Sequence, residues 1–457
     1  MEKQKKYLSL PQKLAYGSGD LGSNFFYMFV SSFAMIYMTN TIGLNAGIIG
    51  TLIMVSKLLD GFTDVIFGSI LDRTKSKMGK ARPWMFFSGF PLAISMILAF
   101  AIPSGMGEIA QYVWFFIAYT CANALFYTAN NISYATMSAL ITKNETERVS
   151  LGSFRYVFAV TGSILVSSIT VMLTEVFGGG AAGWRTVAII YAVILVIFNS
   201  LASLCVKELP QDGAEISGSA EEDGQKQEKI SFWKLLKTVL TNKYYLLLLG
   251  IYLFYYTSNN LGTGIGVYYF TYVIGNANLL GVVSMASIIM IVGLIFNPAL
   301  VKKFGMYRVN LYSYIITCIF TAIMMIFIYT ANLGGIVVTA MLRGISMAFL
   351  LGSLNALVAE VAQNNWLKNK IHTEGMMFSC SSIGMKVGSG LGAGMVGWLL
   401  NLVSFDGLAE IQPDSVLSMI KFIYGAIPLI LTILITLCLV FMKVDSENKK
   451  IQEEIKS

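Results

Sequence analysis

Twelve long apolar stretches constrain the fold of this 457-residue chain more than any other feature. Each contains about 20 residues or more, the length that one helix needs to cross the hydrocarbon core of a bilayer. Lipid offers the backbone no hydrogen-bond partners, so each stretch is expected to be helical, and the alternating pattern of a transmembrane β-barrel is absent. The sequence therefore predicts an all-α polytopic membrane protein. Its twelve expected transmembrane helices are 21–42, 45–71, 84–102, 110–138, 150–176, 184–205, 243–273, 279–301, 308–329, 333–361, 374–402 and 417–441.

The composition excludes a soluble protein and most enzyme classes. Hydrophobic residues make up 56% of the chain and charged residues only 12%, whereas roughly a quarter of the residues in a soluble domain are charged. The five cysteines lie inside apolar stretches, at spacings that fit neither a zinc site nor a disulfide framework, so we expect buried free thiols. The single histidine, His372, removes most metalloenzymes and histidine-dependent nucleophiles, so the sequence predicts neither an enzyme nor a bound cofactor.

The distribution of basic residues reports membrane orientation. Most of the 32 Lys and Arg residues lie in the two termini and in the loops after every second apolar stretch, whereas the opposite loops hold mostly acids. Under the positive-inside rule, both termini are expected in the cytoplasm, with the chain in the cytoplasmic (inner) membrane of a bacterial-type cell. The net charge of +7 is thus a topology signal and gives no support to nucleic-acid binding.

One long polar segment divides the chain into two parts with six apolar stretches each. The predicted units are an N-terminal six-helix bundle at 1–206, a cytoplasmic linker at 207–242 and a C-terminal six-helix bundle at 243–457. Similar basic segments after the second and the eighth stretch, at 68–82 and 298–308, weakly support two related halves. Two six-helix bundles around a central cavity are typical of secondary transporters, and we expect the protein to function as a monomer.

Two acids and a lysine lie on one face of the second apolar stretch. Lys57, Asp60 and Asp64 are separated by three and four residues, which places them on the same side of a helix. Two carboxylates this close share a proton or a cation, and oxygen ligands without His or Cys suit H⁺ or Na⁺. With Thr63 as a further oxygen, the stretch is predicted to bind a coupling cation, and Asp60 and Asp64 are its metal ligands if that cation is Na⁺. The alternative is a structural ion pair of Lys57 with Asp60 that leaves Asp64 merely packed.

Three more basic residues lie inside apolar stretches, where an ionisable group costs at least about 2.5–3.5 kcal/mol. Lys386 lies well inside the eleventh stretch, so we predict a functional role for it. Arg155 in the fifth stretch is nearer the cytoplasmic end, and a functional role is predicted for it too. The alternative for both residues is that the side chain snorkels to the membrane interface. Arg343 has no obvious acidic partner in its own stretch and is interpreted as structural. The glycines spaced four residues apart around Lys386, within 384–392, are expected to allow close helix packing.

Amide and phenol side chains recur on one face of the first, fourth and seventh stretches. Such groups suit a polyhydroxylated ligand, because amides donate and accept hydrogen bonds and aromatic rings cover the C–H face of a sugar. The alternative is hydrogen bonding between helices, which is common in membrane bundles. Glycines within 262–266 mark a candidate break in the seventh helix. The polar faces comprise Asp20, Asn24, Tyr27 and Ser31; Tyr127, Thr128, Asn130, Asn131 and Tyr134; and Tyr252, Tyr256, Asn259 and Thr263.

Five motifs carry a resemblance to a known family. They are Lys13-Leu-Ala-Tyr16-Gly17-Ser-Gly19-Asp20, Asp60-xxx-Asp64, Asp72-Arg73-Thr74…Gly79-Lys80-Ala-Arg82-Pro83, Asn131-Ile-Ser-Tyr134 and Glu374-Gly375…Lys386-Val-Gly388. Over essentially the whole chain, the sequence resembles the glycoside–pentoside–hexuronide:cation symporter family, the melibiose-permease-like branch of the major facilitator superfamily. The acids of the second stretch and the basic loop after it are the most specific part. The resemblance implies the major facilitator fold and cation-coupled sugar transport.

The resemblance also implies particular site residues. Its implied cation site consists of Asp60, Thr63, Asp64 and Thr128. Its implied sugar site consists of Asn24, Tyr127, Asn131, Arg155 and Lys386, to which the polar face of the first stretch adds Tyr27.

Three positions depart from the pattern of melibiose-type members. Those members have acids where this chain has Asn24 and Asn131, and a tryptophan where it has Ala135, so a melibiose-like substrate is not favoured. Amides beside Arg155 and Lys386 make the expected cavity more positive, which favours an anionic sugar such as a hexuronide or its glycoside. Neutral pentosides also fit amides and remain the alternative.

The function expected from these features is uptake of a sugar or sugar acid with Na⁺ or H⁺ by alternating access. The cation neutralises the acid pair, the sugar then binds, and the two bundles rock about the filled site within the lipid bilayer. Charged contacts of Asp72, Arg73 and Arg82 are predicted to latch the outward-open state. The alternative within the same fold is a transporter of a lipid or other amphipathic solute, against which the amide-rich faces argue.

Overall fold

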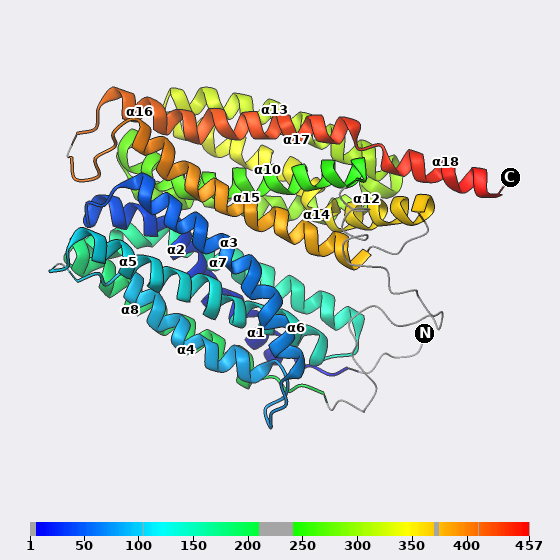
Figure 1. Ribbon diagram of the computed structural model, residues 1–457, viewed down its shortest axis with the longest axis horizontal. Helices are drawn as coiled ribbons and strands as arrows, with labels where there is room; N and C mark the ends of the chain where they lie inside the picture. The colour runs from blue at the N-terminus through cyan, green and yellow to red at the C-terminus, as the bar shows by residue number, and fades with distance from the viewer. Residues whose placement is uncertain (1–5, 104, 210–240, 370–373, 410, 457) are drawn as a thin grey trace.

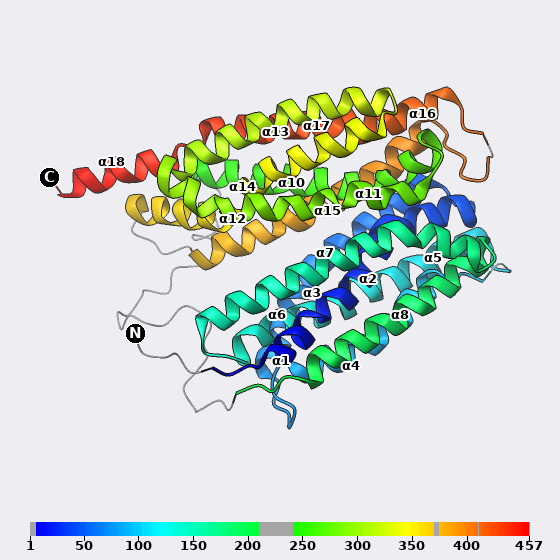
Figure 2. The same cartoon turned by 180° about the vertical axis from the view of Figure 1, so that it is seen from behind.

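The computed structural model describes residues 6–103, 105–209, 241–369, 374–409 and 411–456, and every regular element in these ranges is helical. The helices form two bundles, α1–α8 from the N-terminal half and α10–α18 from the C-terminal half (Figure 1). The view from behind shows the same two bundles side by side along their lengths (Figure 2). The predicted all-α fold class is confirmed. Most of the predicted linker, and His372, lie outside the described residues.

The N-terminal bundle contains six long segments, two of which join consecutive helices. The first segment runs through α1, α2 and the π-helix η1, and the fourth through α5, the π-helix η2 and α6. The bounds are Leu10–Gly17 for α1, Gly19–Ile36 for α2, Tyr37–Thr41 for η1, Ala46–Arg73 for α3, Arg82–Ala99 for α4, Glu108–Thr120 for α5, Cys121–Tyr127 for η2, Thr128–Leu140 for α6, Glu145–Val176 for α7 and Gly180–Leu204 for α8.

The C-terminal bundle is built from corresponding segments and ends in a further helix. Its seventh, eighth and twelfth segments again join consecutive helices. The bounds are Lys243–Tyr268 for α10, Tyr269–Val273 for η3, Ala277–Leu279 for η4, Leu280–Ser284 for α11, Ala286–Phe304 for α12, Met306–Tyr329 for α13, Leu333–Asn369 for α14, Glu374–Leu402 for α15, Asp414–Lys421 for α16, Phe422–Ala426 for η5, Ile427–Phe441 for α17 and Val444–Lys456 for α18.

The helix α10 has no stretch of membrane-crossing length that is as apolar as those of the other predicted spans. Eleven segments of the described chain are long and apolar enough to cross a membrane, and α10 is not among them. It nevertheless packs against α15 and α17 inside its bundle, and its Tyr256, Asn259 and Asn260 line an internal cavity. Its polarity thus marks a cavity wall, because polar residues at membrane depth face the bundle interior. The break predicted within 262–266 is wrong: α10 continues through these glycines, since a freed backbone group there would lack a partner.

Glycines let α15 approach two neighbours closely, one from each bundle. A Cβ at Gly388 would lie 2.5 Å from the carbonyl oxygen of Leu253 in α10. A Cβ at Gly397 would lie 2.2 Å from the carbonyl oxygen of Ala46 in α3. Both distances are well inside van der Waals contact, so these contacts require glycine. The predicted packing role of the glycines around Lys386 is confirmed.

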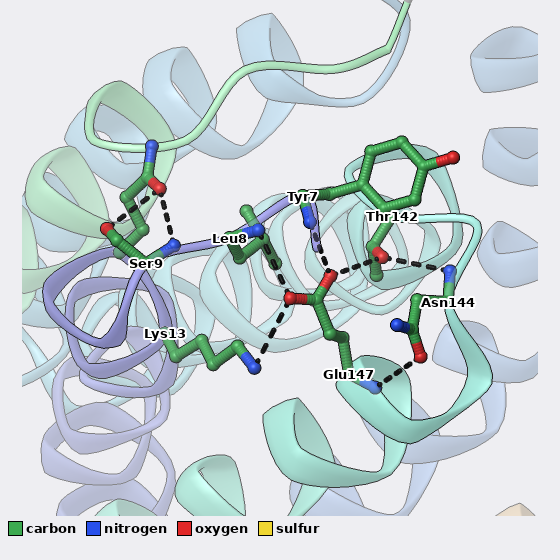
Figure 3. Close-up of polar contacts among 8 residues, drawn as sticks. Tyr7, Leu8, Ser9, Lys13, Thr142, Asn144 and Glu147 are labelled. Atoms are coloured by element: carbon green, nitrogen blue, oxygen red, sulfur yellow. Dashed lines mark hydrogen bonds and ion pairs between the residues drawn. The ribbon is translucent and has the colours of Figure 1, made fainter. Parts of the chain in front are cut away.

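Glu147, at the start of α7, ties the segment ahead of α1 to the bundle (Figure 3). Its buried carboxylate accepts hydrogen bonds from the backbone N–H groups of Tyr7 and Leu8, both at 3.2 Å, and from the Thr142 hydroxyl at 2.8 Å. The Lys13 ammonium lies 3.4 Å from the same carboxylate. Burial by itself would raise the pKa of Glu147, but these hydrogen bonds and the Lys13 charge together lower it below its ordinary value.

We expect Glu147→Gln to destabilise the N-terminal bundle by about 3 kcal/mol, because removing one member of a buried ion pair leaves the other unpaired. The native carboxylate stabilises the fold fully above its unfolded-state pKa of about 4.3, and this stabilisation is lost as the pH falls through the lower folded-state pKa. Thermal unfolding in detergent at about pH 7 and about pH 3 measures the effect of the substitution and the effect of pH. In Glu147→Gln the unfolding temperatures at the two pH values should differ less than in the wild type. Equal unfolding temperatures for wild type and variant near neutral pH would contradict the stabilising role of Glu147. Asp72→Asn, which changes an exposed acid, is the control.

Candidate cation and sugar site

A cavity of about 290 Å³ lies between the two bundles. Its walls come from α2, α3, η2 and α6 of the N-terminal bundle and from α10 and α15 of the C-terminal bundle. The predicted site residues that line it are Tyr27, Asp60, Asp64, Tyr127, Thr128, Asn131 and Lys386. Thr63, Asn24 and Arg155 are not among its lining residues. The structure thus brings most predicted cation and sugar ligands to one space.

Lys386 of α15 bridges both acids of α3. Its ammonium lies 2.6 Å from Oδ2 of Asp60 and 2.5 Å from Oδ2 of Asp64, and it also donates to the Asp60 backbone carbonyl at 3.1 Å. The Thr128 hydroxyl donates to the remaining Asp60 oxygen, Oδ1, at 2.5 Å. Two carboxylates therefore share one ammonium, which leaves one negative charge in this group without a directly bonded counter-ion.

Lys57 pairs with neither acid. Its ammonium instead donates to Oδ1 of Asn260 in α10 at 3.1 Å, and it lies 5.8 Å from the centre of the Tyr27 ring. A lysine side chain is long enough to leave the face of its own helix, and here it reaches the opposite bundle. The alternative of a Lys57–Asp60 ion pair is therefore wrong, because Lys386 holds that position.

The cation-site threonines lie in different surroundings. The Thr63 hydroxyl donates to the Asp60 backbone carbonyl within α3 at 3.1 Å, and Thr63 does not line the cavity. Thr128 directly follows η2, whose residues Asn123 and Tyr127 line the cavity with it. Such π-turns recur at functional sites because they rotate the following side chains relative to a regular helix.

The predicted sugar ligands divide into those at the cavity and those behind its wall. The rings of Tyr27 and Tyr127 stack with centroids 6.0 Å apart and planes 22° apart. The amide of Asn131 is exposed on the lining and makes no hydrogen bond to any described residue. Asn24 instead donates to the carbonyl of Asp20 in its own helix at 2.9 Å.

Arg155 of α7 forms an ion pair with Asp20 of α2, a partner that the sequence analysis did not identify. Its Nε lies 2.6 Å from Oδ2 of Asp20 and its Nη2 lies 3.4 Å from Oδ1, and the guanidinium sits 4.0 Å from the centre of the Tyr134 ring. Because Asp20 balances Arg155 and the α3 acids balance Lys386, neither residue offers a free positive charge. The expected positive cavity at these two residues is therefore wrong.

The predicted latch residues make contacts only within the N-terminal bundle. Asp72 pairs with Lys80 at 2.7 Å, and Nε of Arg82 donates to the Ser203 carbonyl at 2.8 Å. Arg73 is exposed. No described residue of the C-terminal bundle pairs with these three residues here, so the latch of the outward-open state stays a prediction.

Glu208 anchors the same loop and was missed by the sequence analysis. Its carboxylate accepts hydrogen bonds from the backbone N–H groups of Lys80, Ala81 and Arg82 at 2.6–2.8 Å, at the N-terminus of α4. A helix N-terminus favours a carboxylate. A single glutamate beyond an apolar stretch gives no signal of this long-range contact.

Comparison with known proteins decides the family. A sequence profile described as MFS/sugar transport protein matches residues 15–446. The chain belongs to this family. The resemblance carried by the sequence motifs is therefore confirmed.

Relatives of this MFS/sugar transport chain cover nearly its whole length. It is 25% identical over 448 residues to the isoprimeverose transporter of Lactiplantibacillus pentosus, which covers 97% of this chain and 91% of that protein. It is 26% identical over 430 residues to the putative glycoside/cation symporter YagG of Escherichia coli (strain K12), covering 93% and 90%. The crystal structure of the nucleoside transporter NupG superposes with a TM-score of 0.64 at 14% identity, covering 94% and 99%, and this likeness shows the fold alone.

A repeat missed by the sequence analysis relates the two halves of this MFS/sugar transport protein. Residues 37–43 (YMTNTIG) end the first segment and residues 269–275 (YFTYVIG) end the seventh. Both begin with a π-helix, η1 and η3, and both end in a glycine in the left-handed region, Gly43 at φ 84° and Gly275 at φ 80°. Only glycine adopts that conformation without strain. The shared signal is Tyr-x-Thr-x-x-Ile-Gly, one half-chain apart.

These two turns meet at the end of the bundles opposite the chain termini, which we call the distal end (Figure 1). The hydroxyls of Thr39 and Tyr268 lie 2.9 Å apart, and the Asn40 amide donates to the Tyr272 hydroxyl. Between described residues of the two bundles, no hydrogen bond or ion pair lies farther from the distal end than those of Lys386. The transporter is therefore closed at its distal end.

Proposed function

We propose that this protein is a secondary transporter that carries a sugar or glycoside into a bacterial cell together with Na⁺ or H⁺. The observation that supports this most strongly is the pair Asp60 and Asp64 sharing Lys386 on the wall of a cavity between the bundles. The family, and relatives named as an isoprimeverose transporter and a glycoside/cation symporter, support the same class.

The coupling cation binds at Asp60, Asp64 and Thr128, whose oxygens suit Na⁺ or H⁺. In the present structure the Lys386 ammonium lies between the two carboxylates and acts as their internal counter-ion. An unmatched carboxylate at this depth is costly, so the cation and the lysine together neutralise both acids. Because the acids belong to one bundle and the lysine to the other, the charge state of the site controls a contact between the bundles.

The sugar binds beside the cation, between the tyrosine rings and the amides. Tyr27 and Tyr127 present stacked aromatic surface at the cavity, and Asn131 presents an amide with no partner among the described residues. These groups match the apolar C–H face and the hydroxyls of a sugar. Asn24 and Arg155 do not border the cavity in this conformation, so we assign them no sugar contact here. The described lining gives the alternative, an amphipathic solute, no support.

The orientation follows from the positive-inside rule, which places both termini in the cytoplasm. The distal end then faces the outside of the cell, and the structure represents an inward-facing state. Transport requires the distal contacts to open and the opposite end to close, with Asp72, Arg73 and Arg82 forming the latch.

The energetics of one cation per sugar are sufficient. A single positive charge that crosses about 100 mV gains about 2.3 kcal/mol. A tenfold cation gradient adds about 1.4 kcal/mol. Together they sustain a sugar gradient of roughly several hundred-fold.

Uptake by right-side-out membrane vesicles tests the proposal. Labelled glycosides and uronides are supplied under an imposed Na⁺ gradient, an imposed H⁺ gradient or neither. We expect accumulation of at least one sugar only with an inward cation gradient, and the effective gradient identifies the ion. Failure of every glycoside to accumulate under either gradient would refute the function.

A further inference from the structure

A second cavity, of about 240 Å³, contains a charge that the proposed transport cycle does not use. It is enclosed by α2 and α7 of the N-terminal bundle and by helices of the C-terminal bundle that include α10, α13 and α14. Asn259 lines this cavity and also the cavity of the acid pair, so the two spaces meet at that residue. Among the described residues that line it, Arg343 of α14 is the only charged one.

Arg343 has no acidic partner among the described residues. Within that part of the chain its buried Nε makes no hydrogen bond, and its Nη1 reaches only the weakly accepting Sδ of Met324 at 4.0 Å. The other basic residues at this depth are satisfied, Arg155 and Lys386 by carboxylates and Lys57 by an amide. An unpaired guanidinium inside a membrane bundle is costly, so its presence marks a functional site. The structural role inferred for Arg343 from the sequence finds no ion pair among the described residues to support it.

Two hydroxyls in the same cavity also lack partners among the described residues. The Oγ atoms of Ser167 in α7 and Ser258 in α10 are buried and make no hydrogen bond in the described part of the chain. They belong to different bundles, so unpaired polar atoms border this space from both sides. Buried polar groups nearly always have hydrogen-bond partners. Three unpaired donors therefore border one cavity, where they are available to the atoms of a ligand.

We propose that this cavity is an oxyanion subsite, in which Arg343 binds a carboxylate, sulfonate or phosphate group of the transported sugar and Ser167 and Ser258 donate to it. The proposal rests on the proposed function, because it places the sugar ring in the adjoining cavity with Asn259 at the junction. A guanidinium matches an oxyanion through two parallel N–H donors. The oxyanion of the substrate is then the counter-ion of Arg343. The same oxyanion accepts a hydrogen bond from Ser167, so it contacts both bundles.

Matched pairs of sugars that differ only at C6 test the subsite. Uptake of methyl glucuronide is compared with that of methyl glucoside, and the galacto pair is compared in the same way, in wild-type vesicles and in Arg343→Gln. We expect wild type to prefer the uronide of one pair, and Arg343→Gln to raise its half-saturation concentration by about tenfold or more while the hexoside changes by less than about twofold. The half-saturation concentration of Arg343→Lys for the uronide should lie between those of wild type and Arg343→Gln, because an ammonium keeps the charge but lacks the two parallel N–H donors of the guanidinium. Arg185→Gln, at an exposed arginine of α8, should change neither.

The outcomes separate the subsite from the function. Equal losses for both sugars in Arg343→Gln, an unchanged uronide preference, or a wild type without such a preference would overturn the subsite while leaving the function intact. If hexoside uptake requires added inorganic sulfate in wild type but not in Arg343→Gln, Arg343 binds a free anion. That result would also overturn the subsite. If Arg343→Gln does not reach the membrane, Ser258→Ala replaces it, with a selective loss of uronide affinity expected. Wild-type vesicles without cation-driven uptake would refute the function, and thermal protection of the purified protein by methyl glucuronide would still report the subsite.

Discussion

We expect the Asp64→Asn variant to lose cation-driven accumulation, with the sugar gradient falling from roughly several hundred-fold to unity. Asp64 forms an ion pair with the Lys386 ammonium, and Asp60 keeps both Lys386 and Thr128 after the change. The remaining acid and the lysine then balance each other, so the site no longer requires a cation. Asparagine has nearly the same shape as aspartate, so the bundle is expected to fold. Uptake in right-side-out vesicles, with and without the effective ion gradient, measures the loss.

Two comparisons make the Asp64→Asn result specific. Glu453→Gln removes an exposed acid of α18, outside the cavity, and it should retain cation-driven accumulation. Exchange of labelled for unlabelled sugar across vesicles at equal concentrations should persist in Asp64→Asn, because it needs sugar binding and bundle movement but no gradient. Normal accumulation in Asp64→Asn would refute the assignment of the cation site.

The helical period predicted which residues share a face of α3, and it did so correctly for Asp60 and Asp64. The same reasoning offered Lys57 as their partner, because a period describes one helix only. The actual partner, Lys386, comes from α15 in the other bundle. Which faces meet is set by the packing of whole helices, and here glycines at 394–397 let α15 approach α3. No pattern within a single stretch contains that information.

The same limit explains the outcome for Arg155 and Arg343. Each was judged against its own stretch, yet Arg155 is balanced by Asp20 from α2 while Arg343 meets no acid in the described chain. Arg155 and Lys386, which were expected to make the cavity positive, are paired with acids. Arg343, which was interpreted as structural, has no ion pair among the described residues. The distal closure is a different case, because the repeat of residues 37–43 in 269–275 was present in the sequence and could have been found by comparing the two halves.

We expect Gly397→Val to reduce uptake by roughly a hundredfold by opposing closure of the distal end. A Cβ there would lie 2.2 Å from the Ala46 carbonyl and 2.9 Å from the Cα of Gly50, so the added side chain meets backbone of the opposite bundle. Overpacking of this kind costs about 3 kcal/mol. Because the clash exists only when α15 and α3 are in contact, it lowers the population of the distal-closed state by roughly a hundredfold. Outward-facing sugar binding should persist, so the variant should bind sugar from outside and fail to deliver it.

Labelling of a cysteine in the cavity separates this effect from misfolding. In a background without other cysteines, Ser389→Cys lines the cavity of the acid pair and should react with a membrane-impermeant thiol reagent only when the distal end is open. Adding Gly397→Val should increase labelling from outside, whereas Gly68→Val should not, because a Cβ at Gly68 in the same helix pair meets nothing within 4 Å. If both valine variants transport and label alike, contact of α15 with α3 does not control the distal end. If only Gly397→Val traps the outward-facing state, the glycines of α15 determine how closely the two bundles approach at the distal end. The ion pairs of Lys386 with Asp60 and Asp64 join the same two helices, so they form when α15 and α3 come together.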